Sequence, residues 1–136
     1  MAYFGELTSY AYLPGRPAAI NVGWLDAAHE FDKGAVPDAA VDELRRLAAV
    51  SPVNQTRGFH RCELCAAEPS FSPMVSWQDC TRQLGSAEVW VQSPDGVTYA
   101  CPDLIVHYID AHGYCPPAVV IDALMQMAKI ATGDAR

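Results

Sequence analysis

The sequence of 136 residues lacks the features of membrane, secreted and nucleic-acid-binding proteins. Its apolar runs are short, whereas a transmembrane helix needs about 20 consecutive apolar residues. Residues 1–6 hold no basic side chain and no continuous apolar stretch, so no signal peptide is expected. Sixteen acidic residues against nine basic ones give a net charge of −7, which argues against binding to a nucleic-acid backbone. We therefore expect a cytoplasmic protein that contacts neither membrane nor nucleic acid.

Common catalytic motifs are also absent. The sequence contains no phosphate-binding P-loop, no Gly-x-Gly-x-x-Gly, no Gly-x-Ser-x-Gly and no His-Glu-x-x-His. The zinc-deaminase pattern, His-x-Glu followed by Pro-Cys-x-x-Cys, fails as well, because Cys62 replaces its glutamate and Arg61 its proline. The sequence therefore does not name a reaction by itself.

The composition is that of one small folded domain with reduced cysteines. Hydrophobic residues make up 51% of the chain and charged residues 18%, which predicts a single domain over residues 1–136. Five cysteines, an odd number, without a secretion signal favour a metal-binding or redox pair over a disulfide scaffold. We interpret Cys80, Cys101 and Cys115 as small buried hydrophobic residues.

The first half of the chain is predicted to contain a strand and a helix. Residues 19–25 alternate between apolar and other side chains, as in a half-buried strand. Pro37 suits the first turn of a helix that ends before Pro52. On this helix Asp42 and Arg46 have the spacing of an ion pair.

The second half is predicted to contain a hairpin and two helices, which makes the fold α+β with a small antiparallel sheet. Ser93-Pro94-Asp95-Gly96 has the composition of a β-turn, and Gly113 suits the end of a helix. The expected elements are an extended segment at 53–60, a long loop at 66–85, strands at 87–92 and 97–100, a helix at 104–112 and a last helix after Pro117.

Two short motifs together supply the ligands of a zinc site. Cys62 and Cys65 form a Cys-x2-Cys, whose spacing lets one turn direct two sulfurs at an ion about 2.3 Å away. His107 and His112 form a His-x4-His on the predicted helix at 104–112. Two thiolates and two imidazoles are the donor set of a closed tetrahedral zinc site.

For His107 and His112 to bind one ion, the helix that carries them must end in an irregular turn. On an ideal helix, residues i and i+5 point about 140° apart. A last turn that tightens or unwinds before Gly113 brings His107 and His112 together. The order of knuckle, hairpin and ligand-bearing helix is that of a treble-clef-like unit with a long insertion.

Other interpretations of these groups remain open. If residues 59–62 are extended, His60 and Cys62 project from the same side. His60 is then a possible replacement for a helix histidine or an acid/base group beside the metal. Glu63 in the knuckle is the nearest candidate carboxylate, with a solvated residue as the plain alternative. The two cysteines could instead form a redox dithiol, or be buried thiols without a metal.

The segment at 54–61 is unusually polar for a core strand. Asn54 and Arg57 are candidates for binding a small polar substrate, because a guanidinium donates two parallel hydrogen bonds to a carboxylate. An edge strand with solvated side chains is the alternative.

The chain resembles an uncharacterised family of small bacterial proteins. The resemblance lies in Arg-Gly-Phe-His-x-Cys-Glu-x-Cys at 57–65, in His-Tyr-x3-His-x-Tyr-x-Pro-Pro at 107–117, and in the segments at 21–26 and 85–88. It covers most of the chain and implies a bacterial cytoplasmic single domain. It implies no activity.

We therefore expect a small zinc-binding protein whose structural site, formed by Cys62, Cys65, His107 and His112, supports a binding or regulatory function. Its partner is expected to be a protein or a small polar ligand. One alternative is a zinc-dependent enzyme in which His60 and Glu63 act on a small polar substrate. A second alternative is an HNH-like nuclease, against which the acidic composition counts.

Overall fold

The computed structural model describes residues 3–10, 18–65 and 73–132 and confirms the α+β class. Two of its three helices lie near the C-terminus, as predicted. Its elements in chain order are β1 (Ile20–Asn21), α1 (Asp38–Val50), β2 (Met74–Trp77), β3 (Cys80–Gln83), β4 (Glu88–Gln92), β5 (Thr98–Pro102), α2 (Ile105–His112) and α3 (Ala118–Thr132).

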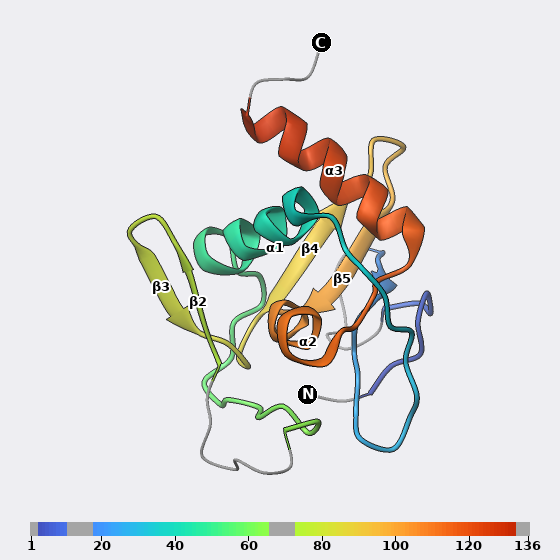
Figure 1. The fold of residues 1–136 in the computed structure, drawn as a ribbon, viewed down its shortest axis with the longest axis vertical. Helices are drawn as coiled ribbons and strands as arrows, with labels where there is room; N and C mark the ends of the chain where they lie inside the picture. Colours follow the sequence, from blue (N-terminus) through green and yellow to red (C-terminus); the bar gives the residue numbers. More distant parts are fainter. Residues whose placement is uncertain (1–2, 11–17, 66–72, 133–136) are drawn as a thin grey trace.

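The central sheet has the strand order β1-β5-β4. β4 and β5 form the predicted antiparallel hairpin, with Trp90 opposite Ala100, and the turn at 93–96 closes with a Gly96 N–H bond to the Ser93 carbonyl at 3.1 Å. β1 pairs with β5 in parallel, with Ile20 opposite Tyr99. α1 and α3 lie side by side over β4 and β5, and α2 lies at one end of the sheet (Figure 1).

The hydrophobic core fills the space between this sheet and the helices. Val89 and Val91 of β4 are fully buried, as are Leu44 of α1 and Leu124 of α3. α1 has its apolar residues at helical spacing, so its buried face is mainly apolar, and Glu43 is the charged residue buried there. This packing places α2, which follows β5 directly, against α1.

The strand predicted at 19–25 is only two residues long. Gly23 has a φ of 79°, a left-handed conformation that turns the chain out of the strand direction. Asn21, Val22 and Trp24 are all buried, so the segment is covered on both faces and not half-buried as the alternation suggested. The Trp24 indole N–H donates to the Ala100 carbonyl at 2.8 Å, which fixes this segment to β5.

The long loop predicted at 66–85 is wrong in its second half. β2 and β3 form an antiparallel hairpin in which Trp77 pairs with Cys80, and this hairpin lies beside α1 away from the central sheet (Figure 1). Residues 66–72 lie outside the described residues. Cys80 is exposed on β3, so its interpretation as a buried residue is also wrong, whereas Cys101 is buried and Cys115 partly so.

The helix predicted after Pro37 is confirmed as α1, but its ion pairs have a different spacing. Arg45 contacts Asp42 at 2.9 Å, and Arg46 pairs with the buried Glu43. Both pairs are three residues apart, so Asp42 bonds to Arg45 and not to Arg46 as predicted. Arg45 also forms an ion pair with Asp110 of α2 at 3.0 Å, which joins the two helices.

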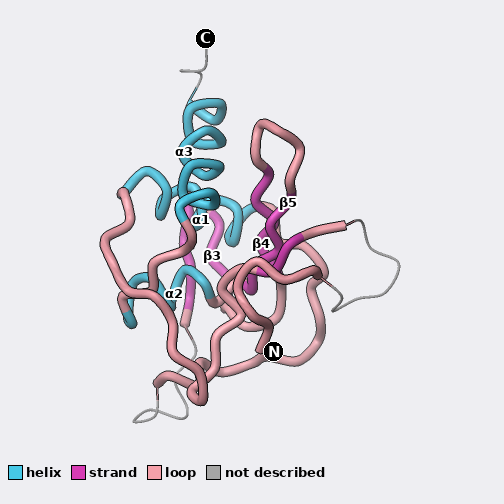
Figure 2. The backbone as a smooth tube through the Cα atoms, turned by 90° about the vertical axis from the view of Figure 1, so that its right-hand side faces the viewer, coloured by secondary structure: helices cyan, strands magenta, loops and turns pink. Residues whose placement is uncertain are grey.

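Loops gather at the end of the molecule that holds α2, opposite the C-terminal end of α3 (Figure 2). The described segments at 51–65 and 3–9 both run through this region. None of the described helices has the length and apolar character that crossing a membrane requires.

Candidate metal centre

The knuckle at Cys62 and Cys65 is a tight turn, and the residues before it contact Gly85. The Cys65 N–H bonds the Cys62 carbonyl at 3.2 Å, which closes the turn, and the His60 N–H bonds the Gly85 carbonyl at 2.8 Å. Gly85 has a φ of 112°, and a Cβ atom there would lie 2.3 Å from the His60 carbonyl oxygen. Only glycine permits this approach, so Gly85 sets the position of the knuckle.

The two histidines lie at either end of α2. His107 is buried in its first turn, and His112 is its last residue and partly exposed. Gly113 follows with a φ of 69°, and the N–H groups of Gly113 and Tyr114 both bond the Tyr108 carbonyl. This left-handed end turns the chain immediately after His112. The two imidazole rings lie 5.1 Å apart, almost perpendicular to each other.

The knuckle and α2 bring their four donor atoms together. Cys65 Sγ lies 3.1 Å from His107 Nε2 and 3.3 Å from His112 Nε2, and Cys62 Sγ lies 3.4 Å from His112 Nε2. All four donor atoms lie within 4.8 Å of one another. Zinc bond lengths of about 2.0–2.3 Å imply donor separations of roughly 3.3–3.8 Å in a tetrahedron. The cluster therefore has nearly the dimensions of a zinc site.

Burial disfavours the charged forms of Cys62, His107 and His112. Burial raises the pKa of the Cys62 thiol to about 11. Burial also lowers the pKa of His107, and His112 adds to this, while burial lowers the pKa of His112 itself. A neutral imidazole is the form that binds a metal, and a bound cation offsets the cost of a buried thiolate. The cluster is therefore suited to a cation.

Asp103 joins the two halves of the cluster. Its carboxylate is fully buried just before α2, where it accepts a hydrogen bond from the Gly85 N–H at 2.8 Å and from Arg82 at 3.1 Å. Arg82 also donates to the Ala48 carbonyl at the end of α1 at 2.9 Å. One carboxylate thus holds both the segment under the knuckle and the start of the ligand-bearing helix.

The other predicted site residues lie outside the four-residue cluster. His60 and Glu63 are exposed, and Arg57 is exposed on the loop that precedes the knuckle. The roles suggested for His60, Glu63, Asn54 and Arg57 remain predictions. Of these residues, Asn54 and His60 do come together, around a small cavity of about 20 Å³ that we call the Glu88 pocket. Its lining also includes Trp24, Thr56, Ser86 and Glu88.

Glu88 is the residue that the sequence analysis missed. It is buried at the start of β4, and its carboxylate accepts hydrogen bonds from Tyr10, Asn54 and Trp90. A glutamate at the first position of a strand that is otherwise Val-Trp-Val-Gln was the available signal, together with its place in the segment at 85–88 that carries the family resemblance.

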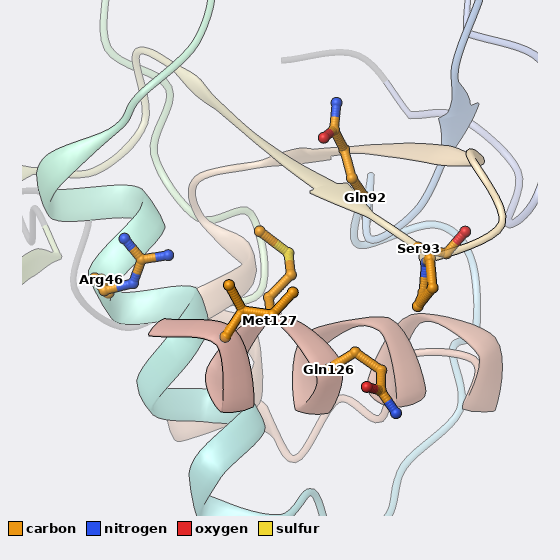
Figure 3. Close-up of a pocket in the computed structure, with 7 residues that line it drawn as sticks. Arg46, Gln92, Ser93, Gln126 and Met127 are labelled. Atoms are coloured by element: carbon orange, nitrogen blue, oxygen red, sulfur yellow. The ribbon is translucent and has the colours of Figure 1, made fainter. Parts of the chain in front are cut away.

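A separate cavity of about 410 Å³ lies between α1, α3 and the turn of the β4–β5 hairpin. Figure 3 shows Arg46 from α1 facing Met127 from α3, with Gln92 and Ser93 on the hairpin side and Gln126 on the helix. None of the predicted site residues lines this cavity, so it is distinct from the metal cluster and from the Glu88 pocket.

The fold and the cluster define an α+β domain with a Cys2His2 group that could hold one metal ion. Residues 2–125 match the family described as a domain of unknown function, DUF7919, and the chain belongs to that family. The predicted membership of an uncharacterised family is thus confirmed. Neither a curated protein nor a solved structure matches the chain.

Proposed function

We propose that this protein is a small zinc-binding domain whose ion is held by Cys62, Cys65, His107 and His112 in a structural role. The observation that carries the proposal is the convergence of four donor atoms, all within 4.8 Å of one another. The two pairs come from distant parts of the chain, since Cys65 and His107 are 42 residues apart. An ion bound between these four donor atoms would explain why they converge.

The donor types favour zinc and a closed site. Two thiolates and two imidazoles in a tetrahedron are typical of structural zinc, whereas catalytic zinc keeps three protein ligands and an open position for water. Four protein donors fill the tetrahedron, which supports a structural ion over the enzyme alternative. His60 and Glu63, the acid/base candidates of that alternative, are outside the cluster.

The ion would tie the knuckle to α2 and so stabilise the loops at that end of the molecule. We infer that the domain then acts as a binding or regulatory module. A net charge of −7 suits a partner with a basic surface, which is consistent with a protein partner.

Metal analysis of the purified protein tests this proposal. We expect one zinc per chain, and a cobalt-substituted sample should show the thiolate-to-metal absorption and ligand-field bands of a tetrahedral Cys2His2 site. Cys62→Ser, Cys65→Ser and His107→Gln should lose the bound metal. The matched controls Cys80→Ser and His60→Gln change the same residue types outside the cluster and should keep it.

A folded wild-type protein that holds well under one zinc per chain and is indifferent to chelator contradicts the proposal. Equal loss of metal from the control variants contradicts the ligand assignment.

A further inference from the structure

The carboxylate of Glu88 is buried, and no positively charged partner for it lies in residues 3–10, 18–65 and 73–132. Its side chain is only 2% exposed, yet Tyr10 OH at 2.9 Å, Asn54 Nδ2 at 3.1 Å and Trp90 Nε1 at 2.7 Å are its only side-chain partners among the residues that the structure describes. All three are neutral donors. A buried charge usually pairs with an opposite charge. Glu88 therefore resembles one half of an ion pair.

The carboxylate also keeps an unused acceptor position. A carboxylate offers about four lone-pair sites. Trp90 and Asn54 both donate to Oε1, whereas Tyr10 is the one donor to Oε2 in the part of the chain that the structure describes. One site on Oε2 thus remains open to a further donor.

The Glu88 pocket has a buried floor and an exposed rim. Glu88, Ser86 and Trp24 are buried, whereas Thr56 and His60 on the rim are exposed. The cavity measures about 20 Å³, slightly above the roughly 10–15 Å³ that one water-sized group requires. Only a group such as a water molecule or an ammonium head fits inside, with any larger part of a ligand outside the rim.

The backbone around the pocket is fixed by three neighbouring contacts. Val53 and Glu88 exchange backbone hydrogen bonds at 2.8 and 2.9 Å, the Thr56 N–H bonds the Ser86 carbonyl at 2.7 Å, and the His60 N–H bonds the Gly85 carbonyl. Asn54 has a φ of 53°, a left-handed conformation that costs energy in most residues. Asparagine adopts this conformation more readily than most residues, and here its side-chain amide donates to Glu88.

We propose that the Glu88 pocket binds the ammonium group of a protonated primary amine. The group is of the right size, brings the missing positive charge and donates to the open site on Oε2. The Thr56 hydroxyl on the rim is a second acceptor. Trp24 beside the carboxylate adds an aromatic surface, which attracts cations. This proposal does not depend on zinc.

The three tryptophans make a direct test possible. Trp90 donates to Glu88 and Trp24 lines the pocket, whereas Trp77 lies on the separate β2–β3 hairpin and is an internal control. Methylammonium chloride is titrated into the ¹⁵N-labelled protein as purified while the three indole N–H signals are followed. We expect a saturable shift of the Trp90 signal and none for Trp77. Potassium chloride and tetramethylammonium chloride at the same concentrations should produce no saturable shift.

Two variants identify the groups that bind. Glu88→Gln keeps the size and can still accept from Trp90 and Asn54, so we expect it to fold but to weaken binding by about tenfold or more. Thr56→Val removes the rim hydroxyl together with its hydrogen bonds to the Ser86 and Gly58 carbonyls, and should weaken binding by a smaller factor. The indole N–H spectrum of the free variant checks that it is folded. The zinc content of both variants is measured alongside, so that failure of this proposal and failure of the zinc proposal are separate results.

Three results overturn the proposal. Absence of a saturable shift in the wild type means that the pocket holds water only. An equal response to potassium means an inorganic cation site and not an amine site. An undiminished response in Glu88→Gln places the bound amine elsewhere.

Discussion

The carboxylate of Asp103 accepts a hydrogen bond from the backbone N–H of Gly85 at 2.8 Å. Gly85 lies under the knuckle, where its carbonyl bonds the His60 N–H, and Asp103 lies just before α2. Neither residue belongs to the metal cluster, yet together they set the distance between its two halves. The stability of the metal centre should therefore depend on both.

Removal of the Asp103 carboxylate is expected to lower the free energy of unfolding substantially. Asp103→Ala leaves Arg82, whose side chain is 15% exposed, without its acidic partner. Loss of one partner of a buried pair costs about 3–5 kcal/mol of unfolding free energy. The control Asp42→Ala breaks an exposed pair and should cost about 1 kcal/mol or less. Denaturant unfolding measures both, and similar losses in the two variants would contradict a central role for Asp103.

Asp103 should also shape the pH dependence of stability. Burial raises the pKa of Asp103 above its ordinary value of 3.8, although Gly85 and Arg82 oppose this. The folded state then holds the proton more tightly than the unfolded chain, so this group's contribution to stability falls as pH rises above about 4. The Asp103→Asn variant has no titratable carboxyl group at this position.

The difference in unfolding free energy between the wild type and Asp103→Asn should therefore decrease as pH rises from 4 through the folded pKa. Unfolding curves at several pH values with the same metal content check this. A difference that increases with pH shows that the pKa is lowered in the folded protein.

Gly85→Ala should disturb the knuckle. The new Cβ would lie 2.3 Å from the His60 carbonyl oxygen, at a backbone φ of 112° that side chains rarely adopt. We expect a loss of about 2 kcal/mol or more and weaker zinc retention, because the backbone that carries Cys62 must move. Gly58→Ala is the control, since nothing lies within 4 Å of its Cβ position. Thermal unfolding and zinc content are the measurements, and equal behaviour of the two variants contradicts the steric argument.

Removal of the metal should destabilise the protein reversibly. An ion that binds only the folded state stabilises it by about 3 kcal/mol or more when its free concentration exceeds the dissociation constant a hundredfold. Chelation should lower the melting temperature, and added zinc should restore it. The double variant Cys62→Ser/Cys65→Ser should show no response to chelator. A wild-type melting temperature that chelation does not change excludes a stabilising ion.

The cluster of four potential metal ligands could be predicted from the sequence because such donors are recognised by residue type and short spacing. Cys62 with Cys65 and His107 with His112 each form a local pair, and Gly113 marked the helix end that brings the histidines together. The structure places these four together. Local patterns also indicated α1, the β4–β5 hairpin and both C-terminal helices, since each depends on its own periodicity and turn residues.

Features that depend on distant contacts could not be predicted in this way. Glu88 acquires its role from Tyr10, Asn54 and Trp90, three residues in separate parts of the chain. The short length of β1 follows from its parallel pairing with β5 and from the turn at Gly23. The β2–β3 hairpin lies in a region rich in proline and serine, whose composition indicated a loop.

The two ligand pairs enclose most of the sheet structure between them. Cys62 and His112 are 50 residues apart, and β2, β3, β4 and β5 all lie between them. An ion that bridges these residues closes the chain into a ring, as a disulfide would, and so restricts the unfolded ensemble. Unlike a disulfide, such a cross-link forms and breaks with the supply of metal. The stability of the four strands that it encloses would therefore depend on the availability of zinc.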